Sequence, residues 1–216
     1  MGKQHDLILK ISQLAILIAL EIIIAFTPLG SIPIGPIVAT TAHIPVIIAA
    51  FILGPLGGGI LGFVFGLLSL IVMTIYPSAT SFVFTPFYGI GNGWSLVICF
   101  LPRILLGVVS GYLSKLFTKY SRNNFQLTIS YILSAITSTL IHSILVLGMI
   151  YIFFGKDYAA ANNIAYDALL AALGMVILTN TLLEAALAAI ISPAVAIPIN
   201  KIFKQKSNHW LLFILK

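Results

Sequence analysis

The strongest constraint on this chain is a series of long apolar runs that charged residues rarely interrupt. Of its 216 residues, 60% are hydrophobic and 7% are Asp, Glu, Lys or Arg, whereas a soluble domain carries about 25% charged residues. A chain with so little polar surface needs lipid as its solvent, and a run of roughly 20 apolar residues can cross a bilayer as a helix. The sequence therefore predicts an all-α integral membrane protein.

Six apolar runs are separated by Gly, Pro and charged clusters, so we expect a compact bundle of six transmembrane helices in a single domain, residues 1–216. The first run is longer than the apolar region of a typical signal peptide and lacks a small-x-small cleavage site, so it is kept as a membrane helix. The predicted spans are 8–28, 37–54, 57–76, 93–116, 126–154 and 167–192.

The distribution of Lys and Arg predicts the orientation of this bundle. With both termini inside, one basic residue, Lys156, lies in the outer loops, and Arg103 lies within a span. The other nine of the 11 basic residues are cytoplasmic, as the positive-inside rule requires. The multi-pass chain is then N-in and C-in, and the stretch KIFKQK (201–206), with Trp210 and Phe213 beyond it, is expected to be an interfacial anchor and not a seventh span.

This orientation places 28–36, 76–93 and 155–166 outside. The 76–93 stretch is uncharged and rich in Pro and aromatic residues. A long external loop over a helical bundle is typical of a lid, so we predict a lid loop between the third and fourth helices.

Several classes of function and site are excluded by the sequence. The basic residues form no aromatic-basic stripe for nucleic acid, there is no phosphate-binding GxxxxGK[ST] loop, and Cys99 is the only cysteine, so no disulfide or Cys-based metal cluster is expected.

Ionisable residues within the membrane are functional candidates because each charge costs at least about 2.5–3.5 kcal/mol to insert. Four such residues are predicted, and two buried polar residues join them. At about 1.5 Å per residue, most of them lie roughly 10–25 Å from the outer ends of their helices, deep enough to converge on one pocket reached from outside. The ionisable residues are Glu21, Arg103, His142 and Glu184, and the polar ones are His43 and Asn180.

Arg103 is the leading candidate, since a guanidinium matches the geometry of a carboxylate or phosphate. A structural ion pair with Glu21 or Glu184 is the alternative. For His142, both a hydrogen bond within the bundle and a substrate contact are open, and a metal ligand is disfavoured. His43 either caps a helix end or binds a ligand, and Glu184 is either structural or a substrate contact.

Aromatic residues gather in the 76–93 region, among them Phe84, Tyr88 and the adjoining Trp94. They suit either a membrane-interface belt or a lid that closes over a ligand, with Asn92 as its hydrogen-bonding group.

In the first helix, Ala15 and Ala19 form a small-xxx-small pair that lets another helix approach closely. Their mean direction lies about 140° from Glu21, so Glu21 is expected to face the bundle while the alanines face a partner.

Three sequence strings resemble one family across essentially the whole chain: TTAHIPVIIAAFILGPLGGGILGFVFGLLSLI (40–71), SATSFVFTPF (78–87) and LPRILLG (101–107). The family is that of the S components, the substrate-binding subunits of energy-coupling factor (ECF) vitamin importers, and the strings are most similar to its pantothenate-type branch. The resemblance implies that Ala15 and Ala19 grip a transmembrane coupling subunit, and that two ATPases drive inward release in a bacterial plasma membrane.

The resemblance also implies a binding subunit that is not an enzyme and needs no cofactor. Pantothenate fits an arginine with His142 and Asn180 nearby, but folate, biotin, cobalamin and hydroxymethylpyrimidine also offer anionic or polar groups. Two other classes stay open: a self-sufficient secondary transporter or channel, and a membrane enzyme that uses His142 and Glu184 as acid and base.

Overall fold

The computed structural model of the chain describes residues 2–34 and 37–214, with side chains at 4, 6–30 and 40–202. Within these residues, five helical segments are long and apolar enough to cross a membrane. The last of them joins α5 to α6 through a π-helical turn, Ile177–Thr181. The helices are α1 (Gly2–Ala25), α2 (Ile44–Ile75), α3 (Gly93–Thr118), α4 (Asn124–Ala161), α5 (Leu169–Val176) and α6 (Leu182–Ile214).

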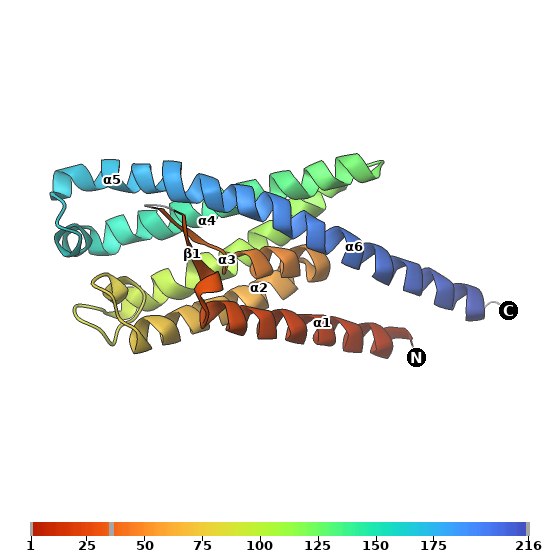
Figure 1. Ribbon diagram of the computed structural model, residues 1–216. Coiled ribbons are helices and arrows are strands. Elements are labelled where there is room, and N and C mark those ends of the chain that lie inside the picture. The colour runs from red at the N-terminus through yellow and green to blue at the C-terminus, as the bar shows by residue number, and fades with distance from the viewer. Residues whose placement is uncertain (1, 35–36, 215–216) are drawn as a thin grey trace.

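Helix α2 is broken at Gly54, which adopts φ 78° and ψ −171°, a backbone conformation that glycine tolerates and other residues avoid. A methyl group added at Gly58 would lie 2.7 Å from the Cβ of Ala50, although residues eight apart in a straight helix are about 12 Å apart. The chain therefore reverses at Gly54, as Figure 1 shows, and α2 is a helical hairpin with a short first arm.

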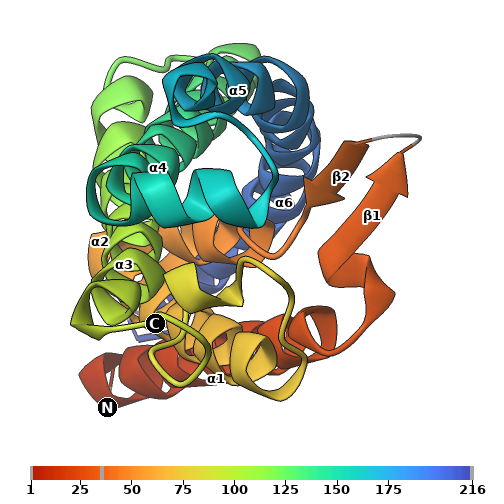
Figure 2. The ribbon, with the colours of Figure 1, turned by 90° about the vertical axis from the view of Figure 1, so that its left-hand side faces the viewer.

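A small antiparallel hairpin precedes α2. Strand β1 (Ser31–Ile34) pairs with β2 (Ile37–Thr40), Ser31 opposite Thr40, and Figure 2 shows the hairpin at the edge of the bundle beside α6. The expectation that the second span begins at residue 37 is therefore wrong, because β2 occupies 37–40 and the helix begins at Ile44. The apolar residues of β2 supply hydropathy without a helical period, which the sequence reading could not separate from a helix.

The second arm of α2 and helix α3 form the most extensive helix contact of the bundle. Gly58, Gly62 and Gly66 recur every four residues on the α2 side, and a methyl group at any of them would overlap α3. At Gly62 the overlap is with the backbone carbonyl of Arg103. Small residues let membrane helices approach this closely, so this glycine row fixes the position of the α3 backbone at Arg103.

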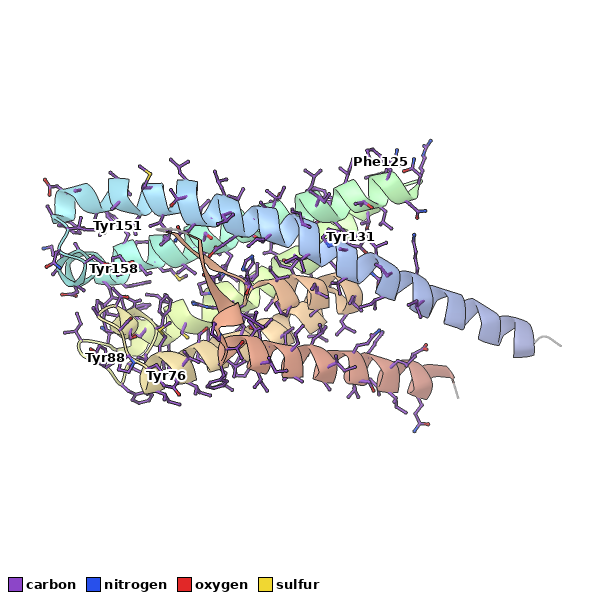
Figure 3. All side chains as sticks on the ribbon, in the orientation of Figure 1. Tyr76, Tyr88, Phe125, Tyr131, Tyr151 and Tyr158 are labelled. Atoms are coloured by element: carbon purple, nitrogen blue, oxygen red, sulfur yellow. The ribbon has the colours of Figure 1, made fainter. Side chains whose placement is uncertain are left out.

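A polar contact joins helices α2, α4 and α6. The Nδ2 of Asn200 donates to the backbone oxygen of Phe51 and to the hydroxyl of Tyr131, each at 3.1 Å. The ring of Tyr131, labelled in Figure 3, stacks on that of Phe51 with centroids 4.6 Å apart. Asn200 is needed because the residue four beyond Phe51 is Pro55, which has no N–H to donate.

The two ends of the bundle in Figure 1 carry different parts of the chain. The two termini and the connection from α3 to α4 lie at one end, and the 76–93 and 162–168 connections lie at the other. Helix α6 continues as one helix to Ile214, but the side chains of the expected interfacial anchor, including Trp210 and Phe213, lie outside those described.

Candidate functional site

Arg103 is held inside the bundle by a carbonyl group of its own helix. Its side chain is 7% exposed, and its Nη1 donates to the backbone oxygen of Ile98 at 2.7 Å. In a regular helix that oxygen would accept from the residue four positions later, but that residue is Pro102, which has no N–H. Pro102 thus frees the carbonyl that orients the guanidinium.

The opposite edge of the guanidinium remains available. The Nε of Arg103 is buried without a hydrogen-bond partner in the described residues, and no Asp or Glu described there lies within ion-pair distance of it. Because Nη1 is the nitrogen on the Cδ side, the free Nε and Nη2 form the edge that binds a carboxylate with two hydrogen bonds. The expected alternative, an ion pair with Glu21 or Glu184, does not form in this structure.

Two aromatic rings lie at the guanidinium of Arg103. The Cζ atom is 4.7 Å from the ring centroid of Phe84 and 5.5 Å from that of Phe65, both within cation–π range. Phe65 belongs to α2 and Phe84 to the 76–93 loop, so the loop and the bundle both contact the arginine. These rings exclude water from the charge and strengthen any hydrogen bond that it makes to an anion.

His142 lies next to Arg103. Its Nδ1 is 3.0 Å from the backbone oxygen of Pro102, and its ring is within electrostatic range of both Arg103 and His43. His43 is 2% exposed, and its Nε2 has no hydrogen-bond partner among the described residues. The structure therefore brings Arg103, His142, His43 and Phe84 together.

His43 also marks the start of α2, where it is the N-cap residue without a capping hydrogen bond from its side chain. The residues that follow, from Ile44 to Phe51, are all buried, so the first arm of α2 begins within the bundle. A helix N-terminus carries partial positive charge. Together with Arg103, it gives this region a positive electrostatic character suited to an anion.

The 76–93 loop is packed onto the bundle. Ser81, Phe82, Val83 and Thr85 are buried, the Ser95 hydroxyl of α3 donates to the Phe82 backbone oxygen at 2.6 Å, and the rings of Phe82 and Phe154 meet edge to face. The short helix Ser81–Val83 therefore anchors the loop and presents the adjacent Phe84 to Arg103.

The remaining aromatic and amide candidates of this region lie apart from Arg103. Trp94 is 50% exposed and Tyr88 is 38% exposed, and Figure 3 shows Tyr88 near the loop end of the molecule. Trp94 stacks on Phe153 with centroids 4.1 Å apart. The side chain of Asn92 is exposed and accepts from the backbone N–H of Trp94 at 2.9 Å as the N-cap of α3, so its amide already has a structural partner.

Glu184 and Asn180 flank the hairpin side of the bundle. The Oε1 of Glu184 accepts from the backbone N–H of Thr40 at 2.9 Å, which ties the end of β2 to α6. Asn180 is half-buried within the π-helical turn and its Oδ1 accepts from the Thr179 hydroxyl at 3.3 Å. Asn180 therefore lies in an irregular turn, with an extra residue per turn, between α5 and α6.

Helix α1 separates its two predicted surfaces. Glu21 is fully buried with neither carboxyl oxygen hydrogen-bonded in the described residues, whereas Ala15 and Ala19 are exposed. This is the placement expected from the helical angle. Within the described residues, no group of three or more His, Cys, Asp or Glu side chains is arranged to hold a metal ion.

Arg103 lines neither of two surface hollows on the described part of the bundle. One is apolar and lies between the second arm of α2 and α3, at Pro55, Phe63 and Val108. The other lies at Asn92, Trp94 and Val97. The anion-binding candidate is an interior cluster beneath the loop, marked by the buried and unpartnered Nε of Arg103 and Nε2 of His43. Sequence reasoning missed Phe65, the Ile98 carbonyl and Thr139, whose buried Oγ1 also has no partner in the described chain.

Comparison with known proteins supports one family. The model of the ECF transporter, substrate-specific component, matches residues 10–196. The chain is 33% identical to the pantothenic acid transporter PanT of Lactococcus lactis subsp. cremoris (strain MG1363), covering 88% of this chain and 93% of that protein. Among solved structures, it is similar to the S-component for biotin from an ECF-type ABC transporter, with a TM-score of 0.49, 21% identity and coverage of 88% and 92%.

The family and the PanT relative are transporter components and not enzymes. The matched range spans all five of the apolar helical segments wholly or in large part. This chain is accordingly a multi-pass membrane protein that belongs to the substrate-specific component family of ECF transporters.

Proposed function

We propose that this chain is the pantothenate-binding subunit of an ECF importer in a bacterial plasma membrane. It captures the vitamin from outside and delivers it inward when partner subunits hydrolyse ATP. The single observation that carries the proposal is the guanidinium of Arg103, whose Nε is buried and unpartnered beside Phe84 and His142. The identity to a pantothenic acid transporter supports the choice of vitamin.

Pantothenate has a carboxylate at one end, an amide in the middle and hydroxyl groups at the other end. Its carboxylate pairs with the Nε and Nη2 edge of Arg103, because a buried guanidinium without an anion is unfavourable and a two-bond pair offsets that. The same edge would bind the carboxylate of folate or biotin, so the vitamins must be compared directly in one binding assay.

The bundle is proposed to cross the membrane six times, with the two arms of α2 counted separately. Both termini and the basic α3–α4 connection lie inside, in agreement with the Lys and Arg distribution. The 76–93 loop lies outside as the lid. Since Cys99 is the only cysteine and is buried, cysteines introduced at Ser78 and Ser121 would report the two sides by labelling with a membrane-impermeant maleimide.

The partners of the proposed function are a transmembrane coupling subunit and two ATPase subunits. The exposed pair Ala15 and Ala19 on α1 provides the close-packing surface for the coupling subunit. The remaining described surface is rich in exposed large hydrophobic side chains, which suits contact with lipid.

The deciding experiment is a binding assay on the purified chain without ATP. Thermal shift and calorimetry would be measured with pantothenate, folate, biotin, cobalamin and hydroxymethylpyrimidine. The proposal expects saturable binding of pantothenate above all others, and uptake into liposomes only when the partner subunits are present. Binding of a different vitamin would reassign the substrate, and ion-coupled uptake by this chain alone would favour a secondary transporter.

A further inference from the structure

His142 has one ring nitrogen committed to the protein backbone. Its Nδ1 lies 3.0 Å from the backbone oxygen of Pro102, and a carbonyl oxygen can only accept a hydrogen bond. Nδ1 must therefore carry a proton. In an imidazole with a single proton on Nδ1, the other nitrogen, Nε2, is a hydrogen-bond acceptor.

A second proton on this ring is unfavourable for a reason of placement. The ring binds the backbone of the residue directly before Arg103, and a second positive charge so close to the guanidinium would be repelled by it. Among the described residues, no carboxylate forms an ion pair with His142. The Nε2 of His142 therefore stays an acceptor, with no hydrogen-bond donor for it in the described part of the protein.

Because Nε2 is a hydrogen-bond acceptor, it restricts which part of a substrate can approach His142. A carboxylate would bring oxygen lone pairs against the lone pair of Nε2, which is repulsive. A donor group, N–H or O–H, would satisfy it. His142 binds the carbonyl of Pro102, the residue before Arg103, so a group that adjoins a carboxylate bound by Arg103 is the part of the substrate that could reach this ring.

We infer that His142 selects the substrate by accepting a hydrogen bond, at Nε2, from the amide N–H that neighbours the carboxylate. This inference rests on the proposed function, because pantothenate separates its carboxylate from its amide nitrogen by two methylene groups. Arg103 then recognises the charge, and His142 recognises the polarity of the adjoining group. A vitamin with the same charge but an acceptor at that position is rejected.

The test uses two ligands that differ at this position alone: pantothenate and its ester analogue, in which oxygen replaces the amide N–H. The full-length purified chain would be titrated with each by calorimetry. Two substitutions separate the nitrogens of the ring. In His142→Asn the side-chain amide reaches the Nδ1 position and keeps a donor for Pro102, but has no atom at the Nε2 position. In His142→Gln the carbonyl oxygen reaches the Nε2 position, and the Pro102 bond is lost.

We expect the wild-type chain to prefer the amide over the ester by about tenfold or more, since the site would leave an acceptor unsatisfied against the ester. The His142→Gln variant keeps most of this preference. In the His142→Asn variant the preference falls to about twofold or less. Thermal unfolding of each variant shows whether it is folded, and the wild-type ratio tests the inference even if a variant is not.

Each outcome has one reading. Equal wild-type binding of amide and ester overturns the role of His142 but leaves pantothenate as substrate. A His142→Asn variant with the full wild-type preference overturns it as well. A folded wild-type chain that binds neither compound overturns the proposed function, and the inference with it.

Discussion

Arg103 binds the carbonyl oxygen of Ile98, the group that Pro102 leaves without its helical donor. The same relationship recurs where Asn200 binds the carbonyl oxygen of Phe51, four residues before Pro55. In both cases a proline within a helical stretch frees an acceptor, and a polar side chain satisfies it. The first of these pairs orients the proposed substrate site, and the second fastens α6 to α2.

The substitution Pro102→Ala tests whether the freed carbonyl orients Arg103. Alanine restores a backbone N–H that competes for the Ile98 oxygen, so the guanidinium loses its fixed position. Affinity for pantothenate is expected to fall about tenfold, in line with the loss of one hydrogen bond to a charged group. The helix itself gains stability, because proline is less favourable than alanine by up to about 3 kcal/mol in a helix interior. Calorimetry and thermal unfolding would measure the two effects, and unchanged affinity would contradict the prediction.

Gly62→Ala is expected to damage both packing and binding. The added methyl group would overlap the backbone carbonyl of Arg103, and overpacking typically costs about 1–3 kcal/mol. Gly148→Ala is the matched control, since nothing lies within 4 Å of a methyl group at that helical position. The melting temperature should fall for Gly62→Ala and stay level or rise for Gly148→Ala. A similar response of both variants would refute the close-packing argument.

Glu184 is predicted to fasten the β1–β2 hairpin to α6. Glu184→Ala removes the acceptor of the Thr40 backbone N–H, so hydrogen exchange of that amide should accelerate about tenfold or more. Glu184→Gln keeps a carbonyl oxygen and should give an intermediate rate. Exchange measured by mass spectrometry on peptides covering the hairpin would show the order. Equal protection in all three proteins would mean that the bond contributes nothing to closure.

Asn200→Ala should destabilise the fold without a direct effect on the substrate site. It leaves the Phe51 oxygen and the Tyr131 hydroxyl without their shared donor, at an expected cost of about 1–3 kcal/mol. Tyr131→Phe removes one of these bonds and keeps the ring stack, so its effect should be smaller. The free energy of unfolding in detergent would decide, and a larger loss for Tyr131→Phe would contradict the assignment.

The broad fold followed from the sequence because lipid imposes a simple rule. Long apolar runs must satisfy their own backbone groups, so helices are required, and each predicted span overlaps an observed helix. The ends agree less well, because α1 begins earlier, α4 ends later and α6 continues to Ile214. The start of the second span failed, since the short apolar strand Ile37–Thr40 has the hydropathy of a helix. The reversal at Gly54 falls between the predicted spans 37–54 and 57–76.

The ionisable residues of the candidate site could be predicted from the sequence, but their hydrogen-bond partners could not. Arg103 and His142 stood out because ionisable residues inside a membrane are rare. The Ile98 carbonyl could not be found from residue types, since it is a backbone group that acts only because Pro102 follows four positions later. Asn92 and Glu184 have the right chemistry for a ligand, but local geometry gives each a structural partner, a helix cap and a hairpin amide.

The central claim, that Arg103 recognises a carboxylate, is tested most directly by comparing pantothenate with panthenol, in which an alcohol replaces the carboxylate. Calorimetric titration of the wild-type chain and of Arg103→Ala would give four affinities. The account predicts that the wild-type chain prefers pantothenate by about 100-fold, as two charge-assisted hydrogen bonds would give. In Arg103→Ala this preference should shrink to a few-fold. Equal wild-type binding of the two compounds, or a preference that survives in Arg103→Ala, would contradict it.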